Sequence, residues 1–217
     1  MELGSIFIIL VLILSIVIHE VAHGYAANFL GDPTARLQGR LTLNPISHID
    51  LLGSIIIPGL LVLTSQPFLF GWAKPVPYNP YNLKNQKWGE AFVAFAGPAT
   101  NIILALIFAF LIRSGLAEAV WGPSILELLV PIVFINILLA LFNMIPIPPL
   151  DGSKILKAFL SYRGQMAFSR FEAMMAQHGV IVLFLFIFVF MLIFAPIFSV
   201  VIFSVVEFLT GLPLRGI

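Results

Sequence analysis

The chain has 217 residues, of which 60% are hydrophobic and only 10% are charged. A soluble domain is usually about half apolar and about a quarter charged, so this composition predicts an integral membrane protein. The net charge of +1 gives no support for nucleic-acid binding, and the absence of cysteine excludes disulfides and thiolate metal sites.

The first apolar stretch, residues 4–30, is long enough to cross a bilayer, which takes roughly 20 residues. Gly31, Asp32 and Pro33 follow it and are expected to end the helix. No Lys or Arg precedes this stretch, so a cleaved signal peptide is not expected. We predict a retained membrane helix whose N-terminus lies outside the cell.

The region that follows carries two short patterns. Residues 36–43, RLQGRLTL, alternate between apolar and polar side chains, which predicts a short strand. The apolar run at 51–64 is short for a spanning helix and contains Gly and Pro, so a re-entrant or interfacial segment is expected. Residues 65–90 are rich in Pro, Asn and Lys and are expected to form a loop.

Two further spans are expected at residues 91–112 and 124–145, followed by a polar helical segment at 153–177. A last apolar run, residues 179–210, contains Pro196 and could form one kinked span or a short hairpin. The predicted fold is therefore an all-α polytopic membrane protein with about four main transmembrane helices. A short β or re-entrant segment is expected between the first two. We expect one domain over residues 1–217, with its core at about 4–160.

The basic residues indicate how this chain is oriented. If 51–64 does not cross the membrane, nine Lys and Arg residues lie on one side and two, Arg113 and Arg215, on the other. If 51–64 crosses, the division becomes seven against four. Because Lys and Arg concentrate in cytoplasmic loops, the first arrangement fits better. It predicts a multi-pass protein of the cell membrane with cytoplasmic loops at 31–90 and 146–177.

The stretch HEVAH, residues 19–23, places two histidines and a glutamate inside the first apolar helix. Residues four apart lie on the same face of a helix, so His19 and His23 can bind one metal ion while Glu20 flanks it. In the H-E-x-x-H pattern, two histidines bind zinc and the glutamate is the general base of a metalloprotease. Single histidines in membrane helices also serve in packing or proton relays, but this spacing favours a metal site.

The position of the motif also predicts its depth. His19 lies 11 residues before the expected helix end, which is about 16 Å along the axis. We therefore expect an active site within the membrane, nearer its cytoplasmic face.

A catalytic zinc ion usually has three protein ligands, so two histidines require a partner. Asp151, in NMIPIPPLDGSK, is the best candidate, because the prolines prevent a regular helix and the topology brings it to the side where the first helix ends. Taken alone, Asp-Gly would be read as a turn. The remaining histidines, His48 and His178, are expected to be loop or interfacial residues.

Three motifs in order, HEVAH, AGPATN and NMIPIPPLDG, resemble the site-2 protease family of intramembrane zinc metalloproteases. The resemblance covers about residues 10–160 and implies that His19, His23 and Asp151 are zinc ligands and Glu20 the catalytic base. It also suggests that Asn143 engages the substrate or polarises its carbonyl group; holding the broken backbone after the third span is an equally good alternative. The chain resembles a compact member without a PDZ or CBS domain, and no catalytic position departs from the pattern.

The expected function is hydrolysis of peptide bonds within or near transmembrane segments, with one Zn²⁺ per chain. A substrate helix must unwind before attack, and the strand at 36–43 could hold the unwound segment by β-augmentation. The expected partners are transmembrane protein substrates and the lipid bilayer; the oligomeric state is open. A metal-ion or proton transporter using the same cluster is the alternative, disfavoured because we find no internal repeat. A catalytically dead scaffold is disfavoured because Glu20 is intact.

Overall fold

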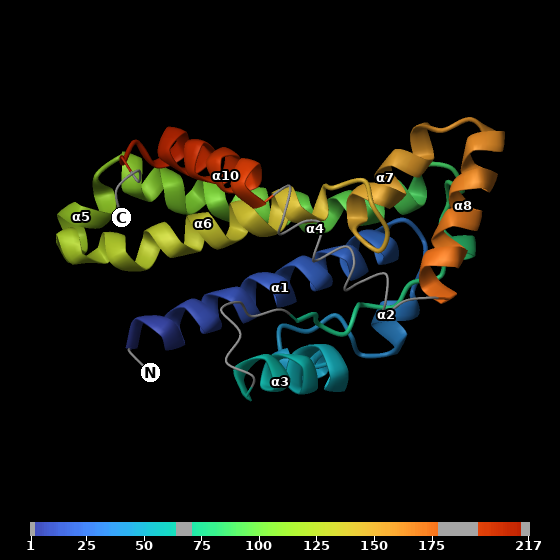
Figure 1. The fold of residues 1–217 in the computed structure, drawn as a ribbon, viewed down its shortest axis with the longest axis horizontal. Coiled ribbons are helices and arrows are strands. Elements are labelled where there is room, and N and C mark those ends of the chain that lie inside the picture. The colour runs from blue at the N-terminus through green and yellow to red at the C-terminus, as the bar shows by residue number, and fades with distance from the viewer. Residues whose placement is uncertain (1–2, 64–70, 178–194, 214–217) are drawn as a thin grey trace.

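The computed structural model describes residues 3–63, 71–177 and 195–213, and every regular element within these ranges is a helix (Figure 1). Three long helices form its centre: α1 (Leu3–Phe29), α4 (Gly89–Arg113) and α6 (Leu126–Asn143). Each is long and apolar enough to cross a membrane, the third together with the 3₁₀ turn η4 (Pro123–Ile125) that precedes it. The three spans predicted from the apolar runs are therefore confirmed, and the chain is a multi-pass membrane protein.

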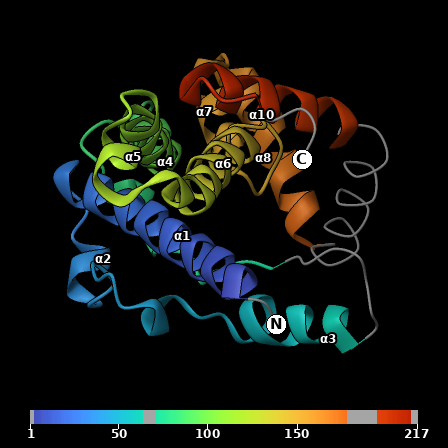
Figure 2. The same cartoon turned by 90° about the vertical axis from the view of Figure 1, so that its left-hand side faces the viewer.

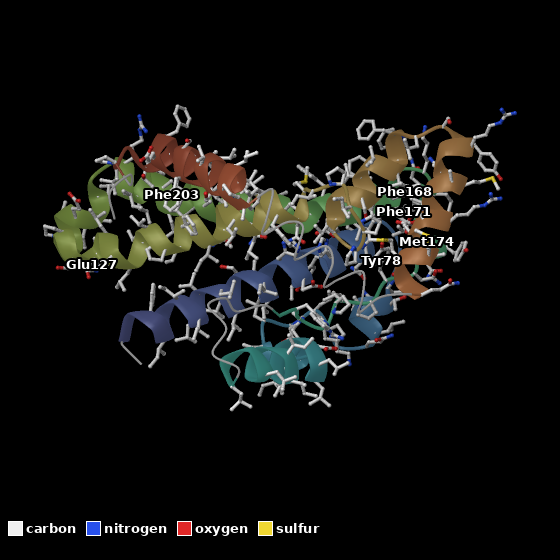
Figure 3. The ribbon with its side chains drawn as sticks, viewed as in Figure 1. Tyr78, Glu127, Phe168, Phe171, Met174 and Phe203 are labelled. Carbon is white, nitrogen blue, oxygen red and sulfur yellow. The ribbon has the colours of Figure 1, made fainter. Side chains whose placement is uncertain are left out.

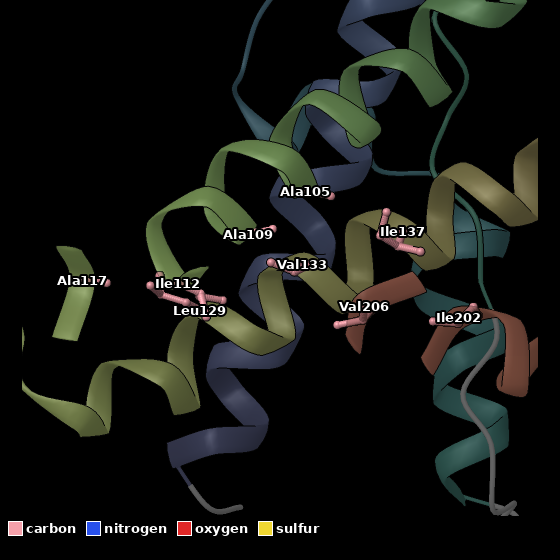
Figure 4. Packing of buried hydrophobic residues seen from close by; sticks show 9 residues of the cluster. All are labelled: Ala105, Ala109, Ile112, Ala117, Leu129, Val133, Ile137, Ile202 and Val206. Carbon is pink, nitrogen blue, oxygen red and sulfur yellow. The ribbon is translucent and has the colours of Figure 1, made fainter. Parts of the chain in front are cut away.

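The helix α4 is the central element, because it packs against both α1 and α6. Figure 2 shows α4 and α6 on one side of α1 and the short helices α2 (Thr34–Leu37) and α3 (Ile57–Leu63) on the other. Small residues of α4, such as Ala105 and Ala109, are fully buried against α6 and α10 (Ala195–Thr210). Small side chains let membrane helices approach closely, since lipid provides no hydrophobic drive for their association. Figure 4 shows this cluster between the three helices.

The end of the bundle where α1 begins contains the turn between α4 and α6 (Figure 1). It is formed by α5 (Leu116–Trp121), which lies between Gly115 and Gly122, both at positive φ. The guanidinium of Arg113 donates to the carbonyl oxygen of Phe208 at 2.6 Å and so joins α4 to the end of α10. The predicted fourth span, 179–210, lies partly outside the described residues, and α10 is the part of it that is described.

The predicted strand at 36–43 is wrong. Residues Thr34–Leu37 form α2, and the rest of this stretch has no regular secondary structure. Asp32 accepts hydrogen bonds from both the backbone N–H and the hydroxyl of Thr34, which forms a turn just before α2 in place of an extended strand. The side chain of Arg40 is buried and donates to the carbonyl oxygens of Lys74 and Pro75, so it does not occupy the solvent face that a strand would require.

The 3₁₀ turn η1 (Pro45–His48) precedes the apolar run at 51–64. The described part of that run forms two short helices: the π-helical turn η2 (Leu51–Ile56) continues directly into α3. None of these described helices is long enough to cross a membrane, which agrees with the prediction that this run does not span.

Residues 71–79, called here the 71–79 segment, have no regular secondary structure and return the chain towards α1. The N–H groups of Trp72 and Lys74 donate to the carbonyl oxygens of Gly53 and His48, respectively. At the other end, the N–H of Asn79 donates to the carboxylate of Asp32 at 2.7 Å. The turn η3 (Pro80–Asn82) then leads to α4.

The helical prediction for 153–177 is confirmed by two helices, α7 (Asp151–Phe159) and α8 (Tyr162–Gln177). The helix α7 packs against α4, and the ammonium of Lys157 contacts the carboxylate of Glu172 in α8 at 2.8 Å. Both helices lie at the end of the molecule where α1 finishes. Figure 3 shows Tyr78 at this end and Glu127 at the opposite end.

Candidate metal and catalytic site

Three buried side chains from two distant parts of the chain meet at the α7 end of the bundle. His19 and His23 lie on successive turns of α1, and Asp151 is the first residue of α7. The carboxylate Oδ2 of Asp151 is 3.2 Å from Nε2 of each histidine. The ligand atoms lie within 4.8 Å of one another, so these three residues could bind one metal ion. Two imidazole nitrogens and one carboxylate oxygen form a donor set suited to zinc.

Both imidazole rings are held so that Nε2 faces Asp151. Nδ1 of His23 donates to the backbone carbonyl of Val93 at 2.7 Å, and Nδ1 of His19 pairs with the amide Oδ1 of Asn101 at 2.5 Å. A hydrogen bond at the outer nitrogen of a histidine fixes the orientation of the ring and the tautomer that can bind a metal. Both acceptors belong to α4, so this helix orients the two histidines of α1.

Gly97 leaves the space that this donor set needs. A Cβ atom at this position of α4 would lie 2.5 Å from Nε2 of His23 and 2.6 Å from Nε2 of His19. Any side chain here would therefore fill the place where both metal-binding nitrogens converge. This gives a physical meaning to AGPATN: Gly97 provides room for the site, and Asn101, about one turn later, holds His19.

Asp151 is positioned by the close packing of the next residue, Gly152, against the backbone that follows α6. The dipeptide Asp151-Gly152 begins a helix, so the simple-turn reading of Asp-Gly is wrong. A Cβ atom at Gly152 would collide with the carbonyl groups of Met144 and Ile145, which shows that glycine is needed for close packing. Burial raises the pKa of the Asp151 carboxyl, but hydrogen bonds from His19 and His23 outweigh it and hold this pKa well below 3.8.

Glu20 lies on the wall of the cavity beside this cluster. Its side chain is half-buried, and its Oε2 accepts a hydrogen bond from the N–H of Val76 at 2.8 Å. The cavity has a volume of about 160 Å³ and joins α1, the 71–79 segment and α7. It is lined by His19, Glu20, His23, Pro75, Val76, Tyr78, Val93, Asn143, Pro149, Asp151 and Lys154.

Asn143 also lines this cavity, at the end of α6. Its Nδ2 donates to the carbonyl oxygen of Leu139 at 2.9 Å, which fits a role in holding the end of this helix. Its place on the cavity wall fits a role in contacting substrate. The two interpretations of Asn143 therefore both stay open.

Sequence reasoning did not anticipate Lys154 and Tyr78. The ammonium of Lys154 lies 4.0 Å from Oδ1 of Asp151 and 5.4 Å from the centre of the Tyr78 ring. Burial lowers the pKa of Lys154, but Tyr78, Asp151 and Glu20 raise it by more, so the side chain stays cationic. The spacing of three residues from Asp151 in a helical segment was the available signal.

Of the two other histidines, only His48 is described. It lies in the short turn η1, away from the metal group as expected, but it is buried and not interfacial. The side chain is buried, and its Nε2 donates to the carbonyl oxygen of Thr42 at 2.9 Å. It therefore helps to hold the irregular stretch after α2. His178 lies outside the described residues.

Membrane-spanning helices with a His-His-Asp group and an adjacent glutamate fit the class of membrane metalloproteases. The sequence model of peptidase family M50 matches residues 7–120 and 114–186, so the chain belongs to this family. This confirms the resemblance to the site-2 proteases.

Known relatives agree with this assignment. The chain is 40% identical over 156 residues to "Putative zinc metalloprotease YwhC" of Bacillus subtilis, a match that covers 70% of this chain and 68% of that protein. It is 28% identical over 158 residues to "Putative zinc metalloprotease Rip2" of Mycolicibacterium smegmatis, covering 71% of this chain and 58% of the relative. The chain thus spans less than two thirds of Rip2. No solved structure was found to match the chain.

Proposed function

We propose that this protein is an intramembrane zinc endopeptidase that hydrolyses peptide bonds within or near the transmembrane segments of other membrane proteins. The observation that carries this proposal is the convergence of His19, His23 and Asp151 beside Glu20 on one cavity. His19 precedes the end of α1 at Phe29 by ten residues, about 15 Å along the axis. The depth of this site supports the proposal that its substrates are themselves membrane-embedded segments.

We expect one Zn²⁺ per chain, held by Nε2 of His19, Nε2 of His23 and the carboxylate of Asp151. When bound, zinc supplies the Lewis acidity that polarises water and a substrate carbonyl group. The Val76 N–H holds Oε2 of Glu20, and we assign proton transfer to the other oxygen, Oε1. Glu20 takes a proton from the attacking water while the oxygen of that water bonds to the carbonyl carbon. Glu20 then gives a proton to the amine that leaves when the C–N bond breaks.

The decisive experiment is Glu20→Gln in proteoliposomes that contain a helical transmembrane substrate. The metal ligands are unchanged, so we expect zinc content to stay at one per chain while cleavage falls by roughly 10²- to 10⁴-fold. Glu118→Gln, in α5 at the opposite end, is the matched control and should cleave normally. Cleavage that persists in Glu20→Gln would rule out the assigned mechanism. Zinc uptake into these vesicles, in the absence of cleavage by the unaltered protein, would favour the transporter alternative.

We further propose that the site lies nearer the cytoplasmic face of the cell membrane. The α7 end of the molecule carries α2, α8 and most of the Lys and Arg residues, which supports this orientation. Because the chain has no cysteine, single cysteines can be labelled without background. Lys84→Cys should react only from the cytoplasmic side and Glu118→Cys only from outside; the reverse pattern would invert the topology.

A further inference from the structure

Three polar side chains lie buried between the spans, away from the cavity. They are Ser15 on α1, Asn101 on α4 and Asn136 on α6; both asparagines are fully buried. A polar group inside a membrane bundle is costly unless it has hydrogen-bond partners, so such residues mark a function. Asn136 has no part in the catalytic steps proposed above.

These side chains form one continuous chain of hydrogen bonds that ends at a candidate metal ligand. Nδ2 of Asn136 donates to the carbonyl oxygen of Ile132 at 2.9 Å and to Oγ of Ser15 at 3.0 Å. Oδ1 of Asn136 accepts from Nδ2 of Asn101 at 2.8 Å. Oδ1 of Asn101 then faces Nδ1 of His19 at 2.5 Å.

The direction of this chain follows from the backbone. The two ends of an amide side chain have similar shapes, so only their partners decide which end is oxygen. The carbonyl of Ile132 can only accept, which turns Nδ2 of Asn136 towards it and Oδ1 towards Asn101. Asn101 must then donate to Asn136, and its own oxygen is left for His19. The Ser15 carbonyl, 3.4 Å from Nδ2 of Asn101, favours the same orientation.

From this geometry we propose that Asn136 is a positioning residue that, through Asn101, keeps His19 in the tautomer able to bind metal. Because Oδ1 of Asn101 can only accept, Nδ1 of His19 must carry a proton, which leaves Nε2 as the nitrogen that can give its lone pair to a metal ion. If Asn136 no longer accepts, Asn101 can rotate and offer Nδ2 to Nδ1 of His19. The proton then moves to Nε2, and that nitrogen cannot bind a metal ion. The zinc-affinity consequence rests on the proposed function, whereas the tautomer does not.

The test compares two substitutions of similar size. Asn136→Leu removes the acceptor, and we expect zinc affinity to fall by roughly 10- to 100-fold, the usual effect of losing an outer partner of a ligand. Asn136→Asp keeps the acceptor: between the spans no cation or donor cluster favours the charged form, so the carboxyl is expected to stay protonated, to donate from one oxygen to Ile132 and to accept from Asn101 at the other. We expect its zinc affinity to stay within about 3-fold of the unaltered protein. Val133→Ala, one turn earlier on α6 and fully buried, controls for lost packing.

Two readouts are needed: zinc affinity by competition with a chelating indicator, and the His19 tautomer in metal-free protein by ¹⁵N NMR of labelled histidine. We expect Nδ1 of His19 to be protonated in the unaltered protein and in Asn136→Asp, and unprotonated in Asn136→Leu, whereas Nε2, which faces the Asp151 carboxylate, can carry a proton in all three. If Asn136→Leu does not fold, Asn136→Asp still tests the proposal. A role that needs the whole amide for folding would be lost in Asn136→Asp as well, whereas the proposed acceptor role would be kept. Unchanged affinity and tautomer in Asn136→Leu, or loss of both in Asn136→Asp, would overturn the proposal. If the unaltered protein binds no zinc, the proposed function fails, while NMR still tests the tautomer.

Discussion

The two walls of the cavity differ in how they are held. One, called here the helix wall, consists of His19 and His23 with Gly97 and Asn101, and it is fixed by buried contacts between α1, α4 and α6. The other, the loop wall, consists of Pro75, Val76 and Tyr78 of the 71–79 segment; Asp151, the third candidate ligand, belongs instead to α7, which packs against α4. Single hydrogen bonds fasten the 71–79 segment here: Val76 donates to Glu20 within α1, and Asn79 donates to Asp32 just after this helix.

This difference suits the two walls to different tasks, metal binding and substrate entry. A metal ligand must stay within a few tenths of an ångström of its position, which suits rigid helices packed in the membrane. A substrate helix must enter and unwind beside the site, which suits a wall held by few bonds. Changes in the helix wall should therefore reduce metal binding, whereas changes in the 71–79 segment should alter cleavage or stability with the metal still bound.

The largest effect is expected from Gly97→Val in the helix wall. A Cβ alone would lie within 2.6 Å of Nε2 of both histidines, so the variant should lose zinc altogether. Metal content of the purified protein measures this directly. Gly59→Ala in α3, where a Cβ would meet nothing within 4 Å, is the control and should keep its zinc. A full zinc complement in Gly97→Val would mean that the ion binds elsewhere.

A smaller effect is expected from Val76→Pro in the loop wall. Proline lacks the N–H that holds Oε2 of Glu20, so cleavage should fall by about 10-fold, the loss of roughly 1.4 kcal/mol of positioning. Zinc affinity should not change, because no ligand is touched. Val76→Ala keeps the N–H and serves as the control. A loss of zinc in Val76→Pro, with zinc retained in Val76→Ala, would show that the two walls are not separable.

The smallest effect on the site itself is expected from Asp32→Ala, which loosens the far end of the 71–79 segment. Asp32 accepts from Thr34, Asn79 and Asn82, and losing a buried charged acceptor should cost roughly 2–3 kcal/mol of stability. Thermal unfolding in detergent measures this loss, with Glu118→Ala, an exposed carboxylate of α5, as a comparison. Zinc affinity near neutral pH should change little.

The same carboxylate predicts a pH dependence. Burial raises the pKa of Asp32, but hydrogen bonds from Thr34, Asn82 and Asn79 outweigh it, so this pKa lies below its ordinary value of 3.8. A lowered pKa in the folded state means that the stabilisation is complete above the unfolded-state value and is lost as pH falls through the folded-state value. The stability difference between the unaltered protein and Asp32→Ala should therefore shrink below about pH 4. A constant difference at acid pH would contradict this.

Much of the site could be predicted because its signals are local. The spacing of His19 and His23 and the break before Asp151 are visible in short stretches of sequence, as are the three apolar spans. The roles of Gly97 and Asn101 could not be predicted in the same way. They depend on which face of α4 turns towards α1, and that rotation is set by packing along the whole length of both helices.

The prediction of a strand at 36–43 was wrong for a related reason. Alternation of apolar and polar residues gives a strand one apolar face, but a strand also needs a neighbouring strand to pair with. Asp32 and Thr34 instead form a turn just before α2, and Arg40 turns inward to Lys74 and Pro75. The idea that this stretch captures substrate by strand addition is withdrawn with the strand.

The sequence distance between the site's parts has a consequence for how the protein is made. His19 and Asp151 are 132 positions apart, and a ribosome releases the first long before the second. A nascent chain with α1 and α4 inserted has both histidines and Glu20 but lacks the carboxylate that completes the donor set. The proposed protease is therefore expected to stay inert during its own synthesis, because its donor set is complete only after α6 is inserted and α7 docks.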